Sequence, residues 1–171
     1  MKESAIFPTI TQAKPEDAEQ IALLFDAYRQ FYRQPPDLQG ALQFISDRLG
    51  EKQSVVFVAW AESAGNPIAV GFVQLYPSFS SVSMKPMWIL NDLYVMAEAR
   101  KQGVGKALME SARQLALSTG AKGIILETAK DNLSAQKLYE QLGYKKDEDF
   151  HRYELSVWAR GDRPAAGRQA L

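Results

Sequence analysis

The sequence predicts an α/β fold in which helices flank one mixed, mostly antiparallel β-sheet, and three observations lead to this prediction. The chain has 171 residues, of which 46% are apolar, which is enough for one compact domain with a continuous core. Two β-rich segments on either side of Gly65-Asn66-Pro67 indicate an antiparallel hairpin. After the hairpin, strand-like and helix-like segments alternate, an order that favours a partly parallel sheet.

The N-terminal third is predicted to hold a short strand and two amphipathic helices. Residues 5–14 begin with β-formers, and a proline followed by two carboxylates is then typical of a helix N-terminus. The first helix should run from about residue 18 to residue 32, because its apolar residues recur at helical spacing: Ile21, Leu24, Phe25, Tyr28 and Tyr32. Pro35-Pro36 interrupts the chain, Asp37 can cap a second helix, and that helix ends at Gly50.

The middle of the chain is predicted to supply the centre of the sheet. Residues 54–62 and 68–76 are the two arms of the hairpin. The Ser-rich segment 77–86 shows no periodicity, so we expect a loop there. Residues 87–95 form a nearly continuous apolar run with two polar residues inside it, which indicates a buried central strand.

The C-terminal half is predicted to alternate between helices and strands. A helical stripe covers residues 104–115, a strand follows at residues 123–128, and Asn132 can cap a shorter helix that Gly143 closes. A last strand is expected where Tyr153, Leu155 and Val157 alternate with polar residues.

The same composition indicates how the domain is bounded and where the protein works. We expect a single domain over residues 1–160 and a flexible C-terminal tail over residues 161–171, because the tail has few apolar residues to bury. Residues 1–14 are too polar for a secretory signal, and no apolar run reaches the roughly 20 residues of a membrane span. We therefore expect a cytoplasmic protein.

Charge and cysteine content exclude several classes of function. Twenty Lys and Arg residues balance twenty Asp and Glu residues, so no net charge attracts nucleic acid or an anionic membrane surface. The chain has no cysteine and one histidine, His151, which excludes thiolate catalysis, disulfides and a Cys/His zinc site. His151 lies beside the expected last strand, and we interpret it as structural or solvated. No metal is expected.

One segment suits anion binding: Arg100-Lys101-Gln102-Gly103-Val104-Gly105-Lys106, between a buried strand and an amphipathic helix. The first turn of a helix has unpaired backbone N–H groups and the positive end of the helix dipole. The two glycines leave these groups uncrowded, and the three cations suit a pyrophosphate. Ala107 after Lys106 excludes a P-loop, and Leu108 stands where a dinucleotide fingerprint needs its third glycine. A glycine-rich connection that only starts a helix is the alternative.

The segment from residue 87 to about residue 146 resembles the GCN5-related N-acetyltransferase (GNAT) family. The resemblance is carried by Arg100-x-x-Gly-x-Gly directly after Asp92-Leu93-Tyr94-Val95, and then by Asn132, Leu138-Tyr139-Glu140 and Leu142-Gly143-Tyr144. It implies the acyl-CoA N-acyltransferase fold, with a splayed parallel pair of strands in the sheet and about four helices. Acetyl-CoA is the implied cofactor. The residues implied to bind it are Leu93, Tyr94, Val95, Arg100, Lys101, Gln102, Gly103, Val104, Gly105, Lys106, Asn132 and Tyr139.

Acetyl transfer to an amine needs a neutral nitrogen, a donor for the oxyanion and a proton for the departing thiolate. Asp92 is the candidate general base, because a carboxylate inside an apolar run is costly unless it is paired or functional. An Asp92 that only holds the sheet by hydrogen bonds is the alternative. Glu127 and a water chain are the other candidate bases, and some relatives carry a glutamate where Asn91 stands.

Tyr139 is the candidate general acid, because a phenol near the sulfur can protonate the leaving thiolate. The alternative for Tyr139 is an ordinary core position, which its helical spacing with Leu138 and Leu142 also suits. The alternative for Asn132 is an ordinary helix cap. For both residues the resemblance favours a place along the thioester end of the cofactor.

The acceptor side is less defined by the sequence. Tyr28, Tyr32 and Asp37 are the candidate acceptor-binding residues, from an aromatic helix face that also suits the core. The predicted function is transfer of acetyl to a primary amine of a small molecule or peptide by direct attack in a ternary complex. The alternatives are a non-catalytic acyl-CoA-binding or regulatory module and an interaction domain without a cofactor. A homodimer through the last strand and the tail would cover an exposed edge. The identity of the amine and the use of longer acyl groups stay open.

Overall fold

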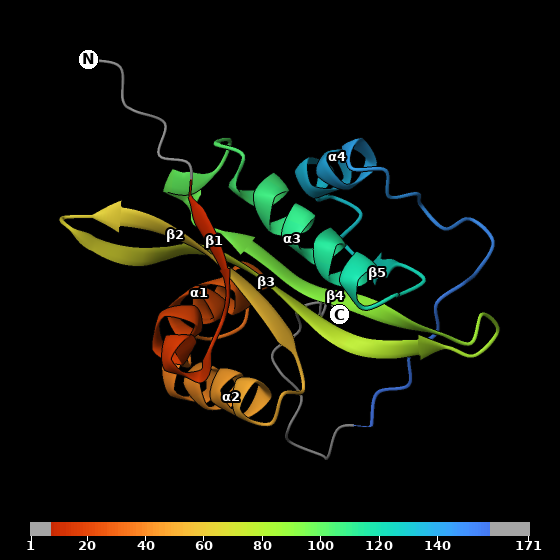
Figure 1. The fold of residues 1–171 in the computed structure, drawn as a ribbon, viewed down its shortest axis with the longest axis horizontal. Coiled ribbons are helices and arrows are strands. Elements are labelled where there is room, and N and C mark those ends of the chain that lie inside the picture. Colours follow the sequence, from red (N-terminus) through yellow and green to blue (C-terminus); the bar gives the residue numbers. More distant parts are fainter. Residues whose placement is uncertain (1–7, 158–171) are drawn as a thin grey trace.

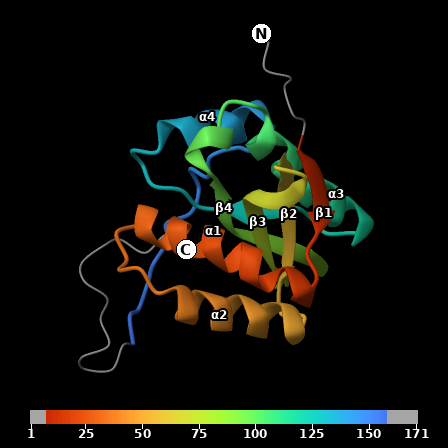
Figure 2. The same ribbon diagram turned by 90° about the vertical axis from the view of Figure 1, so that its left-hand side faces the viewer.

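The computed structural model describes residues 8–157, and one five-stranded sheet organises them in the order β1-β2-β3-β4-β5 (Figure 1). The strands are β1 (Thr9–Gln12), β2 (Val55–Ser63), β3 (Asn66–Ser80), β4 (Lys85–Val95) and β5 (Ile124–Leu126). The helices are α1 (Ala18–Phe31), α2 (Leu38–Gly50), α3 (Val104–Ser118) and α4 (Leu133–Gln141), with short 3-10 turns at Pro15–Asp17 and Ala97–Ala99. Helices α1 and α2 cover one face of the sheet, and α3 and α4 lie on the other (Figure 2).

The pairing of the strands confirms the predicted mixed sheet. Strands β1 to β4 pair antiparallel with their neighbours, while β4 and β5 run parallel from Trp88 opposite Ile124 to Leu90 opposite Leu126. Helix α3 connects these two parallel strands, as a parallel crossover requires.

A β-bulge and the end of a strand pairing coincide in the middle of β4. Leu75 lies opposite Leu90 and Gln74 lies opposite Asp92, so Asn91 is an extra residue without a partner in β3. The pairing of β4 with β5 ends at Leu90. Beyond it, β4 continues to Val95 paired only with β3. Because the bulge shifts the alternation by one residue, Tyr94 packs toward α1 whereas Leu90 packs toward α3.

Each face of the sheet has its own hydrophobic core. Ile21, Ile45 and Phe72 are fully buried on the face that α1 and α2 cover. Leu75 and Leu108 are fully buried on the face that α3 covers. Strand β3 contributes to both cores, because its side chains alternate between the two faces.

Two predicted features differ from the structure. The segment 77–86 is not a loop: β3 runs to Ser80, β4 begins at Lys85, and Ser78 pairs with Met87. The two strands pair with each other across this part of the hairpin, but their side chains are exposed, such as Phe79 at 76% exposure. Because no face is buried there, the sequence shows no alternation of apolar and polar residues.

The predicted last strand is absent from the described residues. Residues 145–157 have no regular secondary structure, and Tyr153, Leu155 and Val157 are exposed although they alternate like strand residues. The alternation finds no partner strand in this part of the structure, and a strand forms only by pairing. His151 is exposed in the same segment, and the predicted flexible tail lies outside the described residues.

Candidate active site

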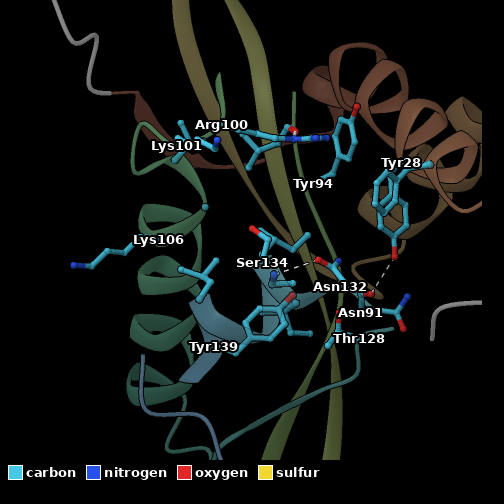
Figure 3. A pocket seen from close by; sticks show the side chains of 18 of the residues that line it. Tyr28, Asn91, Tyr94, Arg100, Lys101, Lys106, Thr128, Asn132, Ser134 and Tyr139 are labelled. Carbon is cyan, nitrogen blue, oxygen red and sulfur yellow. Dashed lines mark hydrogen bonds between the residues drawn. The ribbon is translucent and has the colours of Figure 1, made fainter. Parts of the chain in front are cut away.

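A cavity of about 410 Å³ opens where β4 and β5 part (Figure 3). Its walls come from the end of α1, the second half of β4, the first turn of α3, the residues after β5, and α4. The lining includes eleven of the residues expected to bind the cofactor: Leu93, Tyr94, Val95, Arg100, Lys101, Gly103, Val104, Gly105, Lys106, Asn132 and Tyr139. Gln102 is not among the lining residues, and its side-chain amide donates to the carbonyl oxygen of Glu98 at 2.8 Å.

The first turn of α3 presents free backbone donors to this cavity. The N–H of Ala107 donates to the carbonyl oxygen of Gly103 at 3.0 Å, which leaves the N–H groups of the preceding three residues without an intrahelical acceptor. Gly103 has φ of 83°, a left-handed conformation that favours glycine. A Cβ on Gly105 would lie 3.4 Å from Cδ2 of Leu138. The two glycines therefore differ: the first fits the left-handed backbone turn, and at the second a Cβ would be in ordinary van der Waals contact with α4.

Cationic side chains surround the same turn. Arg100, Lys101 and Lys106 line this end of the cavity. The Nε of Arg100 donates to the carbonyl oxygen of Val95 at 2.9 Å, and its guanidinium lies 5.8 Å from the ring centroid of Tyr94. Figure 3 shows Arg100 beside Tyr94. The turn therefore combines backbone donors, a helix N-terminus and positive charge, the combination that binds phosphate groups.

Asp92 is buried behind the cavity wall and does not line the cavity itself. Its side chain is held by donors: Nε2 of Gln74 at 2.8 Å and Nδ2 of Asn91 at 3.2 Å. Gln74 is fully buried and in turn accepts from the hydroxyl of Ser54 at 2.9 Å. Burial raises the pKa of Asp92 above its ordinary value, and hydrogen bonds from Gln74, Tyr28 and Asn91 act in the opposite direction.

Tyr28 connects Asp92 to the cavity. Its hydroxyl faces Asn91, with 3.5 Å between the oxygen and the Asn91 carbonyl oxygen, and its ring lines the cavity (Figure 3). Burial and the negative charge of Asp92 raise the pKa of Tyr28 far above that of a free phenol. The Tyr28 hydroxyl therefore stays protonated and can donate.

Tyr139 lies across the cavity from Tyr28, on α4 (Figure 3). It is 9% exposed, and burial, with smaller contributions from Tyr32 and Tyr144, raises its pKa to about 12. The phenol is therefore neutral at physiological pH. Asn132 caps α4 by accepting from the N–H of Ala135 at 3.2 Å. It also lines the cavity, so the same residue occupies both the helix-cap and the cavity position.

The candidate acceptor residues separate in the structure. Tyr28 and Tyr32 line the cavity with their rings 5.0 Å apart. Asp37 does not line it; this residue caps α2 by accepting from the N–H of Gly40 at 2.9 Å, and its own N–H donates to Asp26. The alternative base Glu127 lines the cavity and forms a salt bridge with Arg152 from the C-terminal segment.

The structure adds residues that the sequence reasoning missed. Thr128 and Ser134 line the cavity, and no local pattern marks either of them. Gln74 supports Asp92 from the neighbouring strand, and it could have been found, since it is a polar residue inside the apolar run GFVQLY just as Asp92 is in its own strand. Within residues 8–157 there is no cluster of three acidic or histidine side chains that could hold a metal ion, and no helix is long and apolar enough to cross a membrane.

Comparison with known proteins finds acetyltransferases. The model of the acetyltransferase (GNAT) family matches residues 20–144. An uncharacterized N-acetyltransferase of Bacillus subtilis, YhfO, is 49% identical over 151 residues, which cover 88% of this chain and 99% of that protein. A probable acetyltransferase of Haemophilus influenzae is 30% identical over 146 residues, 85% of this chain and 96% of that protein.

Solved structures show the same similarity. The crystal structure of a probable acetyltransferase superposes with a TM-score of 0.81 at 40% identity, over 88% of this chain and 99% of that one. The structure of AAC(6')-Iy in complex with the bisubstrate analogue CoA-S-monomethyl-acetylneamine has a TM-score of 0.69 at 20% identity, over 88% of this chain and 99% of that one, and at this identity it shows the fold alone.

Proposed function

Because the chain belongs to the acetyltransferase (GNAT) family, whose members use acetyl-CoA, we propose that this acetyltransferase carries acetyl from acetyl-CoA to a primary amine by direct attack in a ternary complex. One observation carries the proposal. A single cavity holds the open first turn of α3, the second half of β4, which has no strand on its β5 side, and a buried, protonated Tyr139.

The cavity residues fit acetyl-CoA. The open N–H groups of α3, with Arg100, Lys101 and Lys106, suit the pyrophosphate. The edge of β4 from Leu93 to Val95 has no strand beside it in the described structure, so it suits the amide-containing pantetheine arm. When bound, acetyl-CoA supplies the acetyl thioester and a thiolate leaving group.

Tyr139 is the proposed general acid. Its pKa of about 12 keeps the proton on the phenol, and because a free thiolate with a thiol pKa of about 8.5 is too weak a base to remove it, the proton moves to the sulfur as the C–S bond breaks. The hydroxyl can therefore donate at the sulfur end of the cavity. A backbone N–H near Tyr94 or Val95 is the proposed donor for the oxyanion.

Asp92 is the proposed general base. A free alkylamine has a pKa near 10.4, so at neutral pH only about one molecule in a thousand is nucleophilic without a base. The raised pKa of Asp92 makes it a better proton acceptor than an exposed aspartate. Since it lies behind Tyr28 and Asn91, we assign the proton transfer to a water chain rather than to direct contact.

Two further features belong to this proposal. A homodimer would cover the exposed apolar side chains of the C-terminal segment: Phe150, Tyr153, Leu155 and Val157. Light scattering after size exclusion tests the homodimer, and a monomer at micromolar concentration would contradict it.

A cytoplasmic location, with one domain over residues 1–160, accords with the use of acetyl-CoA, an intracellular metabolite.

Release of free thiol from acetyl-CoA, measured with and without a panel of primary amines, tests the transfer. We expect release that depends on the amine. Binding of acetyl-CoA without amine-dependent release would instead indicate a non-catalytic module, and the absence of any thermal shift with acetyl-CoA would indicate that no cofactor binds.

A further inference from the structure

The two ends of the cavity differ in charge. The lysine and arginine residues that line it, Arg100, Lys101 and Lys106, all lie at the first turn of α3. The lining residues from α1, from the β4 bulge and from the stretch after β5 include one charged residue, the carboxylate Glu127. A second carboxylate, Asp92, lies behind this end, and the charge of Asp131 also acts on Tyr32. The lining of the end away from α3 therefore includes a carboxylate and no cation, and we call it the acidic end; Glu127 there is paired with Arg152.

Aromatic rings cover this acidic end. Tyr28, Phe31 and Tyr32 line it, whereas Tyr94, which also lines the cavity, lies beside the guanidinium of Arg100 at the cationic end. Neighbouring rings meet edge to face: Tyr28 and Tyr32 have centroids 5.0 Å apart, and Phe31 and Tyr32 have centroids 5.2 Å apart. Such rings attract cations through their faces and leave no donor for an anion except the phenol hydroxyls.

A guanidinium lies near this end, but it is already paired. Arg152 forms a salt bridge with Glu127, which lines the cavity. A carboxylate on the acceptor would have to take Arg152 from Glu127, and Glu127 would then lie beside a second negative charge. Two carboxylates brought side by side repel each other, and this repulsion weakens binding.

We propose that the acceptor is a primary alkylamine that enters as a cation and carries no carboxylate next to its amine. The aromatic and acidic end of the cavity, together with the pairing of Arg152 to Glu127, carries this inference, which rests on the proposed acetyl transfer. The ammonium group packs against the rings of Tyr28 and Tyr32, and its excess proton leaves toward Asp92 before the nitrogen attacks. An α-amino acid finds no unpaired cation for its carboxylate among the lining residues at this end.

A series of acceptors with one carbon skeleton isolates the effect of the carboxylate. Phenethylamine, phenylalaninamide and phenylalanine form one series, and isoamylamine, leucinamide and leucine form a second. We expect kcat/KM for the amine and the amide to exceed that for the acid by about tenfold or more. The amide controls for size, because it keeps the volume of the carboxylate without its charge.

The outcomes distinguish a failure of the proposed acceptor class from a failure of the proposed acetyl transfer. If the acids react as well as or better than the amines and amides, the acceptor class is wrong while the transfer stands. If none of the six compounds releases thiol from acetyl-CoA at millimolar concentration, both the transfer and the acceptor class are overturned.

Substitutions at Tyr32 and Arg152 test whether this end of the cavity selects the acceptor. Tyr32→Leu should raise the KM for phenethylamine about tenfold and leave the KM for acetyl-CoA unchanged, whereas Tyr32→Phe, which keeps the ring face, should restore most of the binding. Arg152→Gln should not reduce use of the amines, and Arg113→Gln, an exposed position on α3, is its matched control. A loss of amine use with Arg152→Gln alone would contradict the inference.

Discussion

At the scale of single residues, Asp92 shows how the sheet tolerates a buried carboxylate. Gln74 and Asn91 donate to it, and none of the ion pairs in residues 8–157 includes it. Because burial removes the carboxylate from water, the pKa of Asp92 is raised despite these hydrogen bonds. A polar residue in an apolar strand was visible in the sequence, but the direction of the side chain was not. That direction depends on the bulge at Asn91, which no local pattern marks.

Replacing Asp92 by Asn should stabilise the protein at neutral pH and impair catalysis. The folded pKa lies above the unfolded one, so the aspartate costs stability that grows as pH rises from the unfolded pKa through the folded pKa. Asn does not titrate, and Gln74 and Ser54 can reverse their hydrogen bonds to accept its amide. We expect Tm to rise by about 2–4 °C at pH 7 for each kcal/mol gained.

The pH dependence separates this explanation from a purely structural one. The difference in Tm between Asp92→Asn and the native protein should shrink as pH falls toward 4, and kcat should drop at every pH. Asp149→Asn, at an exposed position, is the control and should change neither quantity. A variant that melts lower than the native protein at all pH values would show that Asp92 only holds the sheet.

Tyr139→Phe should lower kcat by about a hundredfold and leave acetyl-CoA affinity within about twofold, because the ring packing stays and only the proton donor is lost. With a pKa of about 12, Tyr139 should cause no loss of kcat up to about pH 10 in the native enzyme. Stopped-flow or steady-state thiol release against pH measures both effects. Tyr144→Phe, the neighbouring ring at 6.0 Å, is the control; equal losses in both variants would contradict a specific role.

At the scale of elements, the segments with strong periodicity were predicted well. The spacing of apolar residues placed α1, α2, α3 and α4, and the hairpin and the parallel β5 followed from turn residues and element order. The predicted strand boundaries were wrong where the alternation of apolar side chains does not match the hydrogen bonding of the backbone. Strands β3 and β4 remain paired beyond the core at exposed residues, while residues 153–157 have a strand-like alternation without a partner.

The junction of β4 and α3 supplies an element-scale prediction. Gly105→Val should weaken acetyl-CoA binding by about tenfold or more, because a branched side chain in the first turn of α3, with its Cβ in van der Waals contact with Leu138 at 3.4 Å, would crowd the open N–H groups. Gly103→Ala should act differently. Its Cβ would point into open space, so the cost is the left-handed backbone, about 1 kcal/mol of stability with little direct crowding.

Isothermal titration with acetyl-CoA and thermal melts of the same samples separate these two effects. Gly123→Val, at a glycine with open space around it and no left-handed backbone, is the matched control and should bind acetyl-CoA as the native protein does. Unchanged affinity in Gly105→Val would remove the first turn of α3 from the proposed cofactor site.

At the scale of the whole molecule, one sheet joins two cores and the cavity. The face under α1 and α2 supplies the aromatic acceptor end, and the face under α3 supplies the cationic end. The cavity lies where the sheet opens between β4 and β5, so both cores determine its shape. This arrangement was not predictable from local patterns, since it needs the bulge, the splay and the packing of α4 together.

Because β3 places Phe72 in one core and Leu75 in the other, the two cores should unfold together. Ile45→Ala and Leu108→Ala, each at a fully buried position on opposite faces, should both lower a single melting transition, with losses of about 2–5 kcal/mol. Calorimetry with and without acetyl-CoA measures this: bound acetyl-CoA should raise that one transition in both variants by mass action. Two separate transitions in either variant would show that the faces fold independently. The two faces could then not both hold the cavity in shape, and acetyl-CoA should shift only the transition of the α3 face, which carries the proposed phosphate site.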